Sequence, residues 1–200
     1  MRISKSIKER SRSKMLNAFP IVLRNDVENV IDFLSNKNFD IHPTIDQEVI
    51  LSGEKLTIPG RVYFDEPKEG LGNNMTDIQQ TILNCIYLRH HNGYVRQERL
   101  EKLKNNNEYF VTPFIFQLLG EYVVEIVEII NEQAKESKLR NFAQFVEENP
   151  KYWMQTESRM ISYWNEYYRR LTYPNIKKYI GYEIMRKIKN EHTTIYKVRN

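Results

Sequence analysis

The chain contains little cysteine, glycine or proline, and each shortage narrows the class of protein it can be. Its 200 residues include one cysteine, Cys85, together with seven glycines and seven prolines. Because a lone cysteine cannot form an internal disulfide, we expect a protein of a reducing compartment and assign it to the cytoplasm. The low glycine and proline content argues against a disordered chain, and 40% hydrophobic residues suffice for a sizeable core.

Long apolar runs are also missing. The longest uncharged stretch in the hydrophobic middle is YFVTPFIFQLLG, residues 109–120, well short of the ~20 apolar residues that span a bilayer. A basic lead precedes the apolar segment 15–23, but Arg24 and Asp26 follow at once without a small-residue cleavage pattern. We therefore expect neither a signal peptide nor a membrane partner.

Motifs that carry known chemistry are absent. The chain has no glycine-rich phosphate loop and no G-x-S-x-G sequence. His90 and His91 are adjacent, so on a helix they point about 100° apart and cannot share one metal-ligand sphere. Cys85 lies in the apolar run DIQQTILNCIYL, where a buried cysteine acts as a small hydrophobic residue. We expect no catalytic residue, no cofactor and no metal.

One acidic ridge resembles a carboxylate-bridged metal site in part. Its members share one helical face: Glu121, Glu125, Glu128 and Glu132. Such sites use a histidine three residues after a glutamate, and Asn131 occupies that place after Glu128. We therefore interpret the ridge as a solvated or internally paired face.

Charge is distributed unevenly along the sequence. The formal net charge of +4 combines +5 in residues 1–14, −8 in residues 15–150 and +7 in residues 151–200. The basic ends can neutralise the acidic middle within the molecule, or they can present a basic surface to a polyanion. The sequence leaves both alternatives open.

Hydrophobic spacing predicts a mainly α protein with a small N-terminal β-hairpin. Helices are predicted over 24–39, 76–90, 94–104, from Pro113 to about Glu136, and within 139–149, 152–171 and 174–190. Residues 48–64 are rich in β-branched and aromatic side chains and contain the turn signal Ser52-Gly53, which predicts a hairpin whose second strand kinks at Pro59-Gly60. The tail segment 193–198 is a candidate for a short strand added to this hairpin.

Two further details follow from the helical pattern. Thr76 is expected to cap the helix that it precedes, with Gln79 completing a capping box. The expected core positions are Leu83, Leu118, Leu119, Ile161 and Trp164.

The segment GYVRQERLEKL, residues 93–103, follows the pattern G-x-V-R-x-x-x-L-x-x-L and resembles the first helix of a HEAT-type repeat. PFIFQLLGEYVVEIVEII, residues 113–130, resembles its antiparallel partner, and residues 162–184 resemble the helical end of uncharacterised bacterial HEAT-like proteins. The resemblance implies a compact stack of antiparallel helices in which Arg96 braces adjacent helices. No period of about 40 residues recurs, however, and a hairpin is foreign to a pure solenoid.

The expected organisation has four parts. These are a basic N-terminal arm (1–14), a helix-plus-hairpin appendage (15–74), a helical domain (75–190) and a tail (191–200). A helix-turn-helix within 76–104 is not expected to read DNA, because the helix that follows is apolar and acidic and phosphate would repel it.

The leading functional hypothesis is a non-enzymatic scaffold or protein–protein interaction module whose partner is another protein. The alternative is binding of nucleic acid, or of another polyanion, through the basic C-terminal helices and the N-terminal arm, with interleaved tyrosines available to stack on bases. The candidate contacts are Arg169, Arg170, Lys177, Lys178, Arg186, Lys187 and Lys189. An enzyme with an unrecognised site is a third hypothesis.

Overall fold

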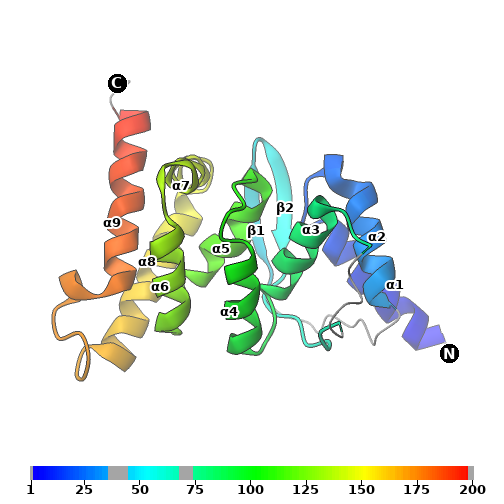
Figure 1. Cartoon of the computed structure of the whole chain (residues 1–200), viewed down its shortest axis with the longest axis horizontal. Coiled ribbons are helices and arrows are strands. Elements are labelled where there is room, and N and C mark those ends of the chain that lie inside the picture. The colour runs from blue at the N-terminus through cyan, green and yellow to red at the C-terminus, as the bar shows by residue number, and fades with distance from the viewer. Residues whose placement is uncertain (1, 36–44, 68–73, 198–200) are drawn as a thin grey trace. The chain divides into compact units, whose positions relative to one another are not determined.

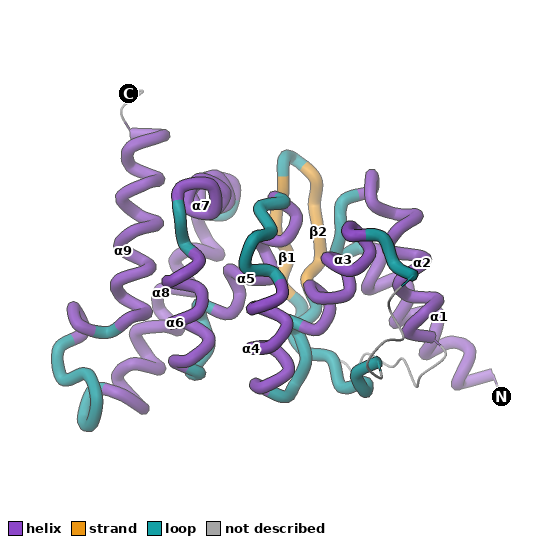
Figure 2. The backbone as a smooth tube through the Cα atoms, in the orientation of Figure 1, coloured by secondary structure: helices purple, strands orange, loops and turns teal. Residues whose placement is uncertain are grey.

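The computed structural model describes residues 2–35, 45–67 and 74–197, and its contacts divide the chain into two units, Met1–Arg99 and Leu100–Asn200. Both units consist mainly of helices, and the N-terminal unit also contains a two-stranded antiparallel sheet (Figure 1, Figure 2). The predicted fold class, mainly α with a small β-hairpin, is confirmed.

The N-terminal unit combines several helices with the hairpin. Its helical elements are α1 (Arg2–Leu16), a short 3-10 turn (Ile21–Leu23), α2 (Arg24–Ser35), α3 (Asp77–Tyr87) and α4 (Gly93–Lys102), of which α4 runs across the unit boundary. Helix α2 packs against α1 and α3, and it buries the face that its apolar spacing predicts: Val27, Val30, Ile31 and Leu34. The predicted end of this helix at residue 39 lies outside the described residues.

The hairpin pairs β1 (Gln47–Leu51) with β2 (Glu54–Ile58) around the predicted turn. Ser52 and Gly53 both have positive φ, at 51° and 83°, which suits a two-residue turn because it matches the right-handed twist of the strands. Inward-facing residues alternate along the strands as a half-buried sheet requires: Val49, Leu51, Leu56 and Ile58.

The second strand is shorter than predicted. It ends just before Pro59, which has no N–H to donate to the ladder. The chain then pairs with the end of α3: the Val62 N–H donates to the Arg89 carbonyl at 2.8 Å, and the Val62 carbonyl accepts from the His91 N–H at 2.9 Å. The predicted continuation of the strand to residue 64 is therefore wrong.

Helix α3 begins as the sequence predicts. The Thr76 hydroxyl accepts from the Gln79 N–H, and the Gln79 side-chain oxygen accepts from the Thr76 N–H, both at 3.3 Å. This reciprocal pair confirms the capping box. Further along the helix Leu83 and Cys85 are buried, and burial holds the pKa of the Cys85 thiol well above its usual value.

The C-terminal unit is helical throughout its ordered elements. These are a 3-10 turn (Tyr109–Val111), α5 (Thr112–Leu118), α6 (Val124–Gln133), α7 (Glu136–Glu148), α8 (Pro150–Tyr163), a π-helical turn (Trp164–Tyr168), a 3-10 turn (Ile176–Lys178), α9 (Ile180–His192) and a terminal π-helical turn (Thr193–Lys197). Helix α9 packs along α6, α7 and α8 (Figure 1). Its buried residues are Gly181, Ile184, Met185 and Ile188.

One predicted helix is two helices. Instead of running from Pro113 to Glu136, the chain ends α5 at Leu118 and begins α6 at Val124. The N–H of Glu121 bonds the Leu118 carbonyl at 3.1 Å, which tightens the last turn, and the Val124 N–H bonds the Tyr168 hydroxyl instead of a main-chain carbonyl. The single long helix is therefore wrong, although Pro113 does lie in the first turn of α5 as predicted.

The expected core is partly correct. Leu83, Leu118 and Leu119 are buried, but Ile161 is 42% exposed and Trp164 is only half-buried. The buried face of α8 is instead the neighbouring one: Tyr152, Thr156 and Met160. At Trp164 the main chain changes to i→i+5 bonding, with the Arg169 N–H donating to the Trp164 carbonyl, so the regular helical stripe ends there.

The tail also differs from its prediction. Thr193–Lys197 forms a helical turn that continues α9, so no strand from residues 193–197 joins the hairpin. Isoleucine and tyrosine favour a strand, but this preference depends on the surroundings, and here the preceding helix extends into them.

Leu118 provides a test of the core. Replacing this fully buried side chain in Leu118→Ala should lower the free energy of unfolding by about 2–5 kcal/mol, because the cavity is lined by packed side chains. Leu171→Ala is the matched control, since Leu171 is 85% exposed and its loss should change the free energy by less than about 0.5 kcal/mol. Urea denaturation of both variants measures the difference, and equal effects would contradict the packing described.

Candidate functional site

Arg96 links two helices at the double-histidine turn. Its Nη1 donates to the carbonyl of His90 at 2.8 Å and to that of His91 at 2.9 Å, and the side chain is buried. The guanidinium thereby satisfies main-chain acceptors beyond the end of α3 and holds them against α4. These hydrogen bonds from α4 to the turn after α3 are what a brace between adjacent helices requires. The resemblance to HEAT repeats stays a prediction.

His90 is a buried component of the same turn. Its Nδ1 accepts from the Asn92 N–H at 3.3 Å, so Nε2 carries the proton and donates to the Phe64 carbonyl at 3.2 Å. Burial, followed by the neighbouring His91, lowers the pKa of His90. His91 lies outside, with its ring stacked on Tyr63 at 5.1 Å. Within residues 2–35, 45–67 and 74–197, no group of three or more His, Cys, Asp or Glu residues could hold a metal ion.

Two arginines with structural roles were missed by sequence reasoning. Arg89 is the largest fully buried side chain, and it donates to the carbonyls of Pro59 at 3.1 Å and Gly60 at 2.7 Å. Arg99 pairs with Glu66 at 2.5 Å and covers the ring of Tyr87 at 4.9 Å. Nothing in the sequence marks these two residues, because Arg99 lies in the polar helix α4 and Arg89 precedes the polar turn of residues 90–92.

Two basic residues of the predicted N-terminal arm are engaged within their own unit. Arg12 is hydrogen-bonded to Asp32 of α2, and Lys14 Nζ lies 2.7 Å from Asp46. Both partners belong to the acidic middle of the sequence. This part of the basic charge is therefore neutralised internally.

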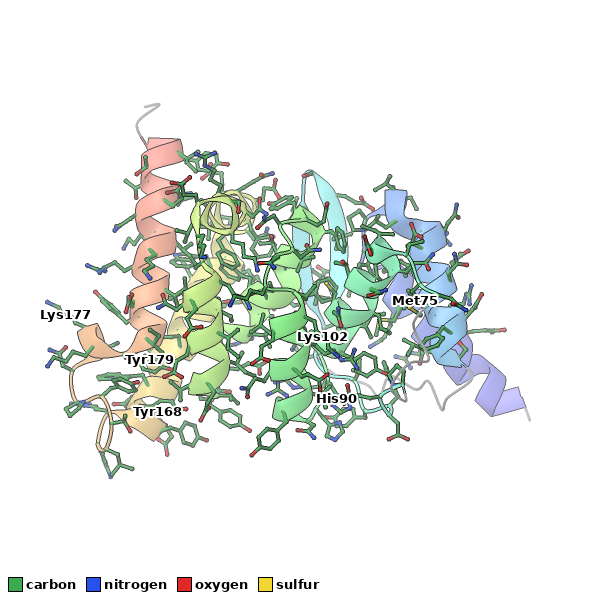
Figure 3. The ribbon with its side chains drawn as sticks, viewed as in Figure 1. Met75, His90, Lys102, Tyr168, Lys177 and Tyr179 are labelled. Carbon is green, nitrogen blue, oxygen red and sulfur yellow. The ribbon has the colours of Figure 1, made fainter. Side chains whose placement is uncertain are left out.

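The C-terminal basic candidates lie on three neighbouring segments. Arg169 and Arg170 follow the π-helical turn, and Arg186, Lys187 and Lys189 lie on α9. Lys177 and Lys178 lie on the 3-10 turn before α9, where Figure 3 labels Lys177. Lys187 is paired, at 3.0 Å from Glu183 and 2.8 Å from the side-chain oxygen of Asn131, and its hydrogen bond lowers the pKa of Glu183.

The other candidates are less constrained. In the part of the chain that the structure describes, Arg170, Lys177, Lys178, Arg186 and Lys189 are exposed and form no direct ion pair with a carboxylate, although the charge of Arg186 contributes to the lowered pKa of Glu183. Arg169 bonds the Asn165 side chain at 2.9 Å and lies over the ring of Trp164 at 5.7 Å. Arg169 and Arg170 also line a polar hollow of about 580 Å³, together with Asn165, Glu166 and Pro174.

Tyrosines form a cluster beside these basic residues. Tyr122, Tyr163 and Tyr167 lie mutually in contact, with ring centroids 5.6–6.1 Å apart, and we name them the tyrosine triangle. Tyr122 is 52% and Tyr167 53% exposed. The sequence predicted tyrosines interleaved with basic residues, but it did not identify Tyr122, which is distant in the sequence.

Tyr168 holds this cluster in place. Its hydroxyl donates to the Tyr122 carbonyl and accepts from the Val124 N–H at 3.3 Å, so it satisfies two main-chain groups where α6 begins. Its ring stacks on the buried Tyr179 at 5.4 Å (Figure 3). Burial raises the pKa of Tyr168, which keeps its donating proton in place. The π-helical turn thus presents Tyr167 from a fixed backbone.

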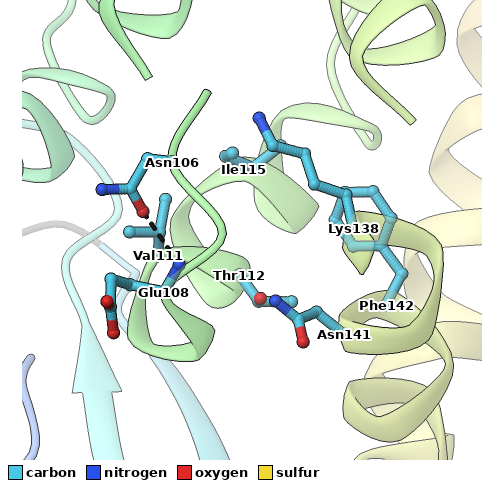
Figure 4. Close-up of a pocket in the computed structure, with 8 residues that line it drawn as sticks. All are labelled: Asn106, Glu108, Val111, Thr112, Ile115, Lys138, Asn141 and Phe142. Atoms are coloured by element: carbon cyan, nitrogen blue, oxygen red, sulfur yellow. Dashed lines mark hydrogen bonds between the residues drawn. The ribbon is translucent and has the colours of Figure 1, made fainter. Parts of the chain in front are cut away.

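A second pocket of this unit is too small to bind a ligand. Asn106, Glu108, Thr112, Asn141 and four further residues line it (Figure 4), and its volume is about 10 Å³. That volume admits at most about one water molecule. A hydrogen bond from the Glu108 N–H to the Asn106 side-chain oxygen, at 3.0 Å, shapes the loop before α5.

Comparison of the chain with models of known protein families, with curated proteins and with solved structures gave no match. Among the helices of the described residues, none combines the length and the apolar character needed to cross a membrane.

His90 makes stability depend on pH. Its folded-state pKa lies below the unfolded value of about 6.5, so the unfolded chain binds the proton more readily and stability falls as pH falls through that value. The loss should approach at most about 1.4 kcal/mol per pH unit. The glutamine amide in His90→Gln can still donate and accept, so the fold should persist while the loss of stability at acidic pH that is due to His90 disappears. His91→Gln should retain most of that loss. Urea denaturation at about pH 7.5 and about pH 5.5 measures it, and an unchanged slope in His90→Gln would contradict this assignment.

Proposed function

We propose that the protein is a non-enzymatic interaction module that binds another protein through the tyrosine triangle of its C-terminal unit. The observation that carries this proposal is a cluster of three tyrosine rings on a fixed backbone, of which Tyr122 and Tyr167 are exposed and Tyr163 is half-buried. Tyrosine buries a large area while losing little conformational entropy, and tyrosine, tryptophan and arginine dominate the binding energy of protein interfaces.

The surroundings of the triangle support the same proposal. Leu171 and Ile161 are exposed nearby in the sequence, on the turn after the π-helical segment and on α8. Arg169 and Arg170 provide donors in the same segment. An apolar and aromatic centre with arginine at its edge is the usual composition of a protein interface.

The position of the π-helical turn is a further argument. Such turns interrupt an α-helix at a cost in regular hydrogen bonding, and they occur frequently at functional sites. Here the turn carries Tyr167 outward and Tyr168 inward, so that one residue can contact a partner while the next fixes the backbone. A preorganised surface loses less entropy on binding.

Site-specific photocrosslinking tests the proposal. A photoreactive amino acid at Tyr122 and, separately, at Tyr167 should crosslink the same protein in cells, whereas the exposed control position Met154 on α8 should not. With that partner purified, Tyr122→Ala combined with Tyr167→Ala should weaken binding by at least about 30-fold, which corresponds to the loss of one hot-spot residue. Equal crosslinking from Met154, or unchanged affinity of the folded double variant, would contradict the proposal.

A second candidate function is binding of single-stranded nucleic acid, and the unpaired basic residues favour it. Arg170, Lys177, Lys178, Arg186 and Lys189 are free to neutralise phosphates, and the triangle offers rings on which bases can stack. We expect these arginines and lysines to contact mainly phosphates, so binding would depend little on base sequence.

A fluorescent single-stranded oligonucleotide titrated at low salt tests this candidate. The logarithm of the affinity should fall with the logarithm of salt at about −0.7 per phosphate neutralised. Lys177→Glu combined with Lys178→Glu should weaken every sequence alike, whereas Arg140→Glu with Lys151→Glu, the same charge change at exposed positions of α7 and α8, should have a smaller effect. The absence of binding at ~100 µM would exclude nucleic acid as the partner.

A further inference from the structure

A polar hollow in the C-terminal unit concentrates lysine side chains. Its volume is about 330 Å³, and it shares no residue with the tyrosine triangle or with the basic turn of residues 169–178. Three lysines line it from different segments: Lys104 after α4, Lys135 before α7 and Lys138 within α7. The remaining lining residues are Asn105, Asn107, Glu132, Gln133 and Ser137.

Lys138 is the buried member of this set. Its side chain is 6% exposed, and Nζ donates to the Leu103 carbonyl and to the Gln133 side-chain oxygen, each at 2.9 Å. An ammonium group has three donors, so these two neutral acceptors leave one N–H unused. Burial lowers the pKa of Lys138 to about 8. A buried cation without a counter-charge is costly, and an anion beside it would reverse that cost.

The hollow can supply the surroundings that an anion needs. Lys104 and Lys135 are exposed at its edge, and Glu132 forms no ion pair with any of the three lysines as far as the structure describes the chain. The first turn of α7 opens onto the same lining through Ser137 and Lys138. The residue before that helix, Lys135, makes no side-chain cap, because a lysine cannot accept a hydrogen bond. Amides of a first turn attract negative charge.

We propose that this hollow is a binding site for a tetrahedral oxyanion, a phosphate group above all, held by Lys104, Lys135 and Lys138 at the start of α7. Lys104 and Lys135 contribute charge from the edge. Lys138 contributes its third N–H, and bound phosphate supplies the negative charge that Lys138 lacks, because its two acceptors are neutral and Glu132 of the lining forms no ion pair with it. The hollow is larger than one phosphate, so a phosphate monoester fits the same chemistry as the free ion.

Titration of the full-length protein at constant ionic strength tests the site. Inorganic phosphate and phenyl phosphate are added in separate experiments, and the amide signals of Ser137 and Lys138 are followed by NMR. Saturable shifts with either compound support the site, and tighter binding of phenyl phosphate identifies the phosphoryl group of a larger molecule as its ligand. Shifts that grow linearly with both compounds, without saturation, would show an adventitious ion effect and overturn the proposal.

Variants locate the binding. Lys104→Gln and Lys135→Gln alter exposed side chains, so the fold should persist, and each should weaken binding by about tenfold through loss of one charge-assisted contact. Arg140→Gln with Lys151→Gln is the matched control for net charge and should leave affinity unchanged. Lys138→Met should abolish saturation, provided that thermal unfolding shows a folded protein. Equal affinity in the Lys104→Gln/Lys135→Gln variant and the control would overturn the site even where Lys138→Met does not fold.

Discussion

Buried cations that donate to main-chain carbonyls at the ends of structural elements are the interaction on which much of this structure depends. The last carbonyls of a helix have no partner within it, and a buried carbonyl without a hydrogen bond is costly. Arg96 donates to carbonyls of the turn after α3, and Arg89 donates to a carbonyl just after the hairpin. Lys138 donates to the Leu103 carbonyl just after α4. Each contact also fixes where the next element begins, so the same groups position the helices.

This use of charge divides the basic residues into two populations. Arg12 and Lys14 pair with aspartates, and Arg89 and Arg96 are buried against carbonyls, so none of these four is available to a partner without breaking internal contacts. The exposed residues Arg170, Lys177 and Lys178, near the π-helical turn and the start of α9, form no such internal contacts in the described part of the chain. The overall charge of +4 therefore says little about binding. What matters is which cations the fold leaves unpaired, and most of those described lie in the C-terminal unit.

Local signals in the sequence predicted the local structure well. Thr76 with Gln79, and the turn at Ser52 and Gly53, succeeded because capping and tight turns depend on a few adjacent residues. The long helix predicted from Pro113 to Glu136 failed because its break depends on a distant group. The break after Leu118 is stabilised by the Tyr168 hydroxyl, which is more than forty residues away, as the 44- and 46-residue separations of its two hydrogen bonds show. The tyrosine triangle has the same origin, since only the fold brings Tyr122 to Tyr163 and Tyr167.

The oxyanion site shows why such features escape a reading of the sequence. Lys104, Lys135 and Lys138 stand among many lysines, and nothing in their spacing distinguishes them from a solvated surface. They become distinctive only because α4 ends where α7 begins, which buries one ammonium and leaves the other two at the rim of a hollow. The two neutral acceptors at Lys138 fix its position without neutralising its charge. The Leu103 carbonyl after α4 accepts a hydrogen bond from the Lys138 ammonium, and this contact leaves a positive charge without a counter-charge. That charge gives the hollow its preference for an anion.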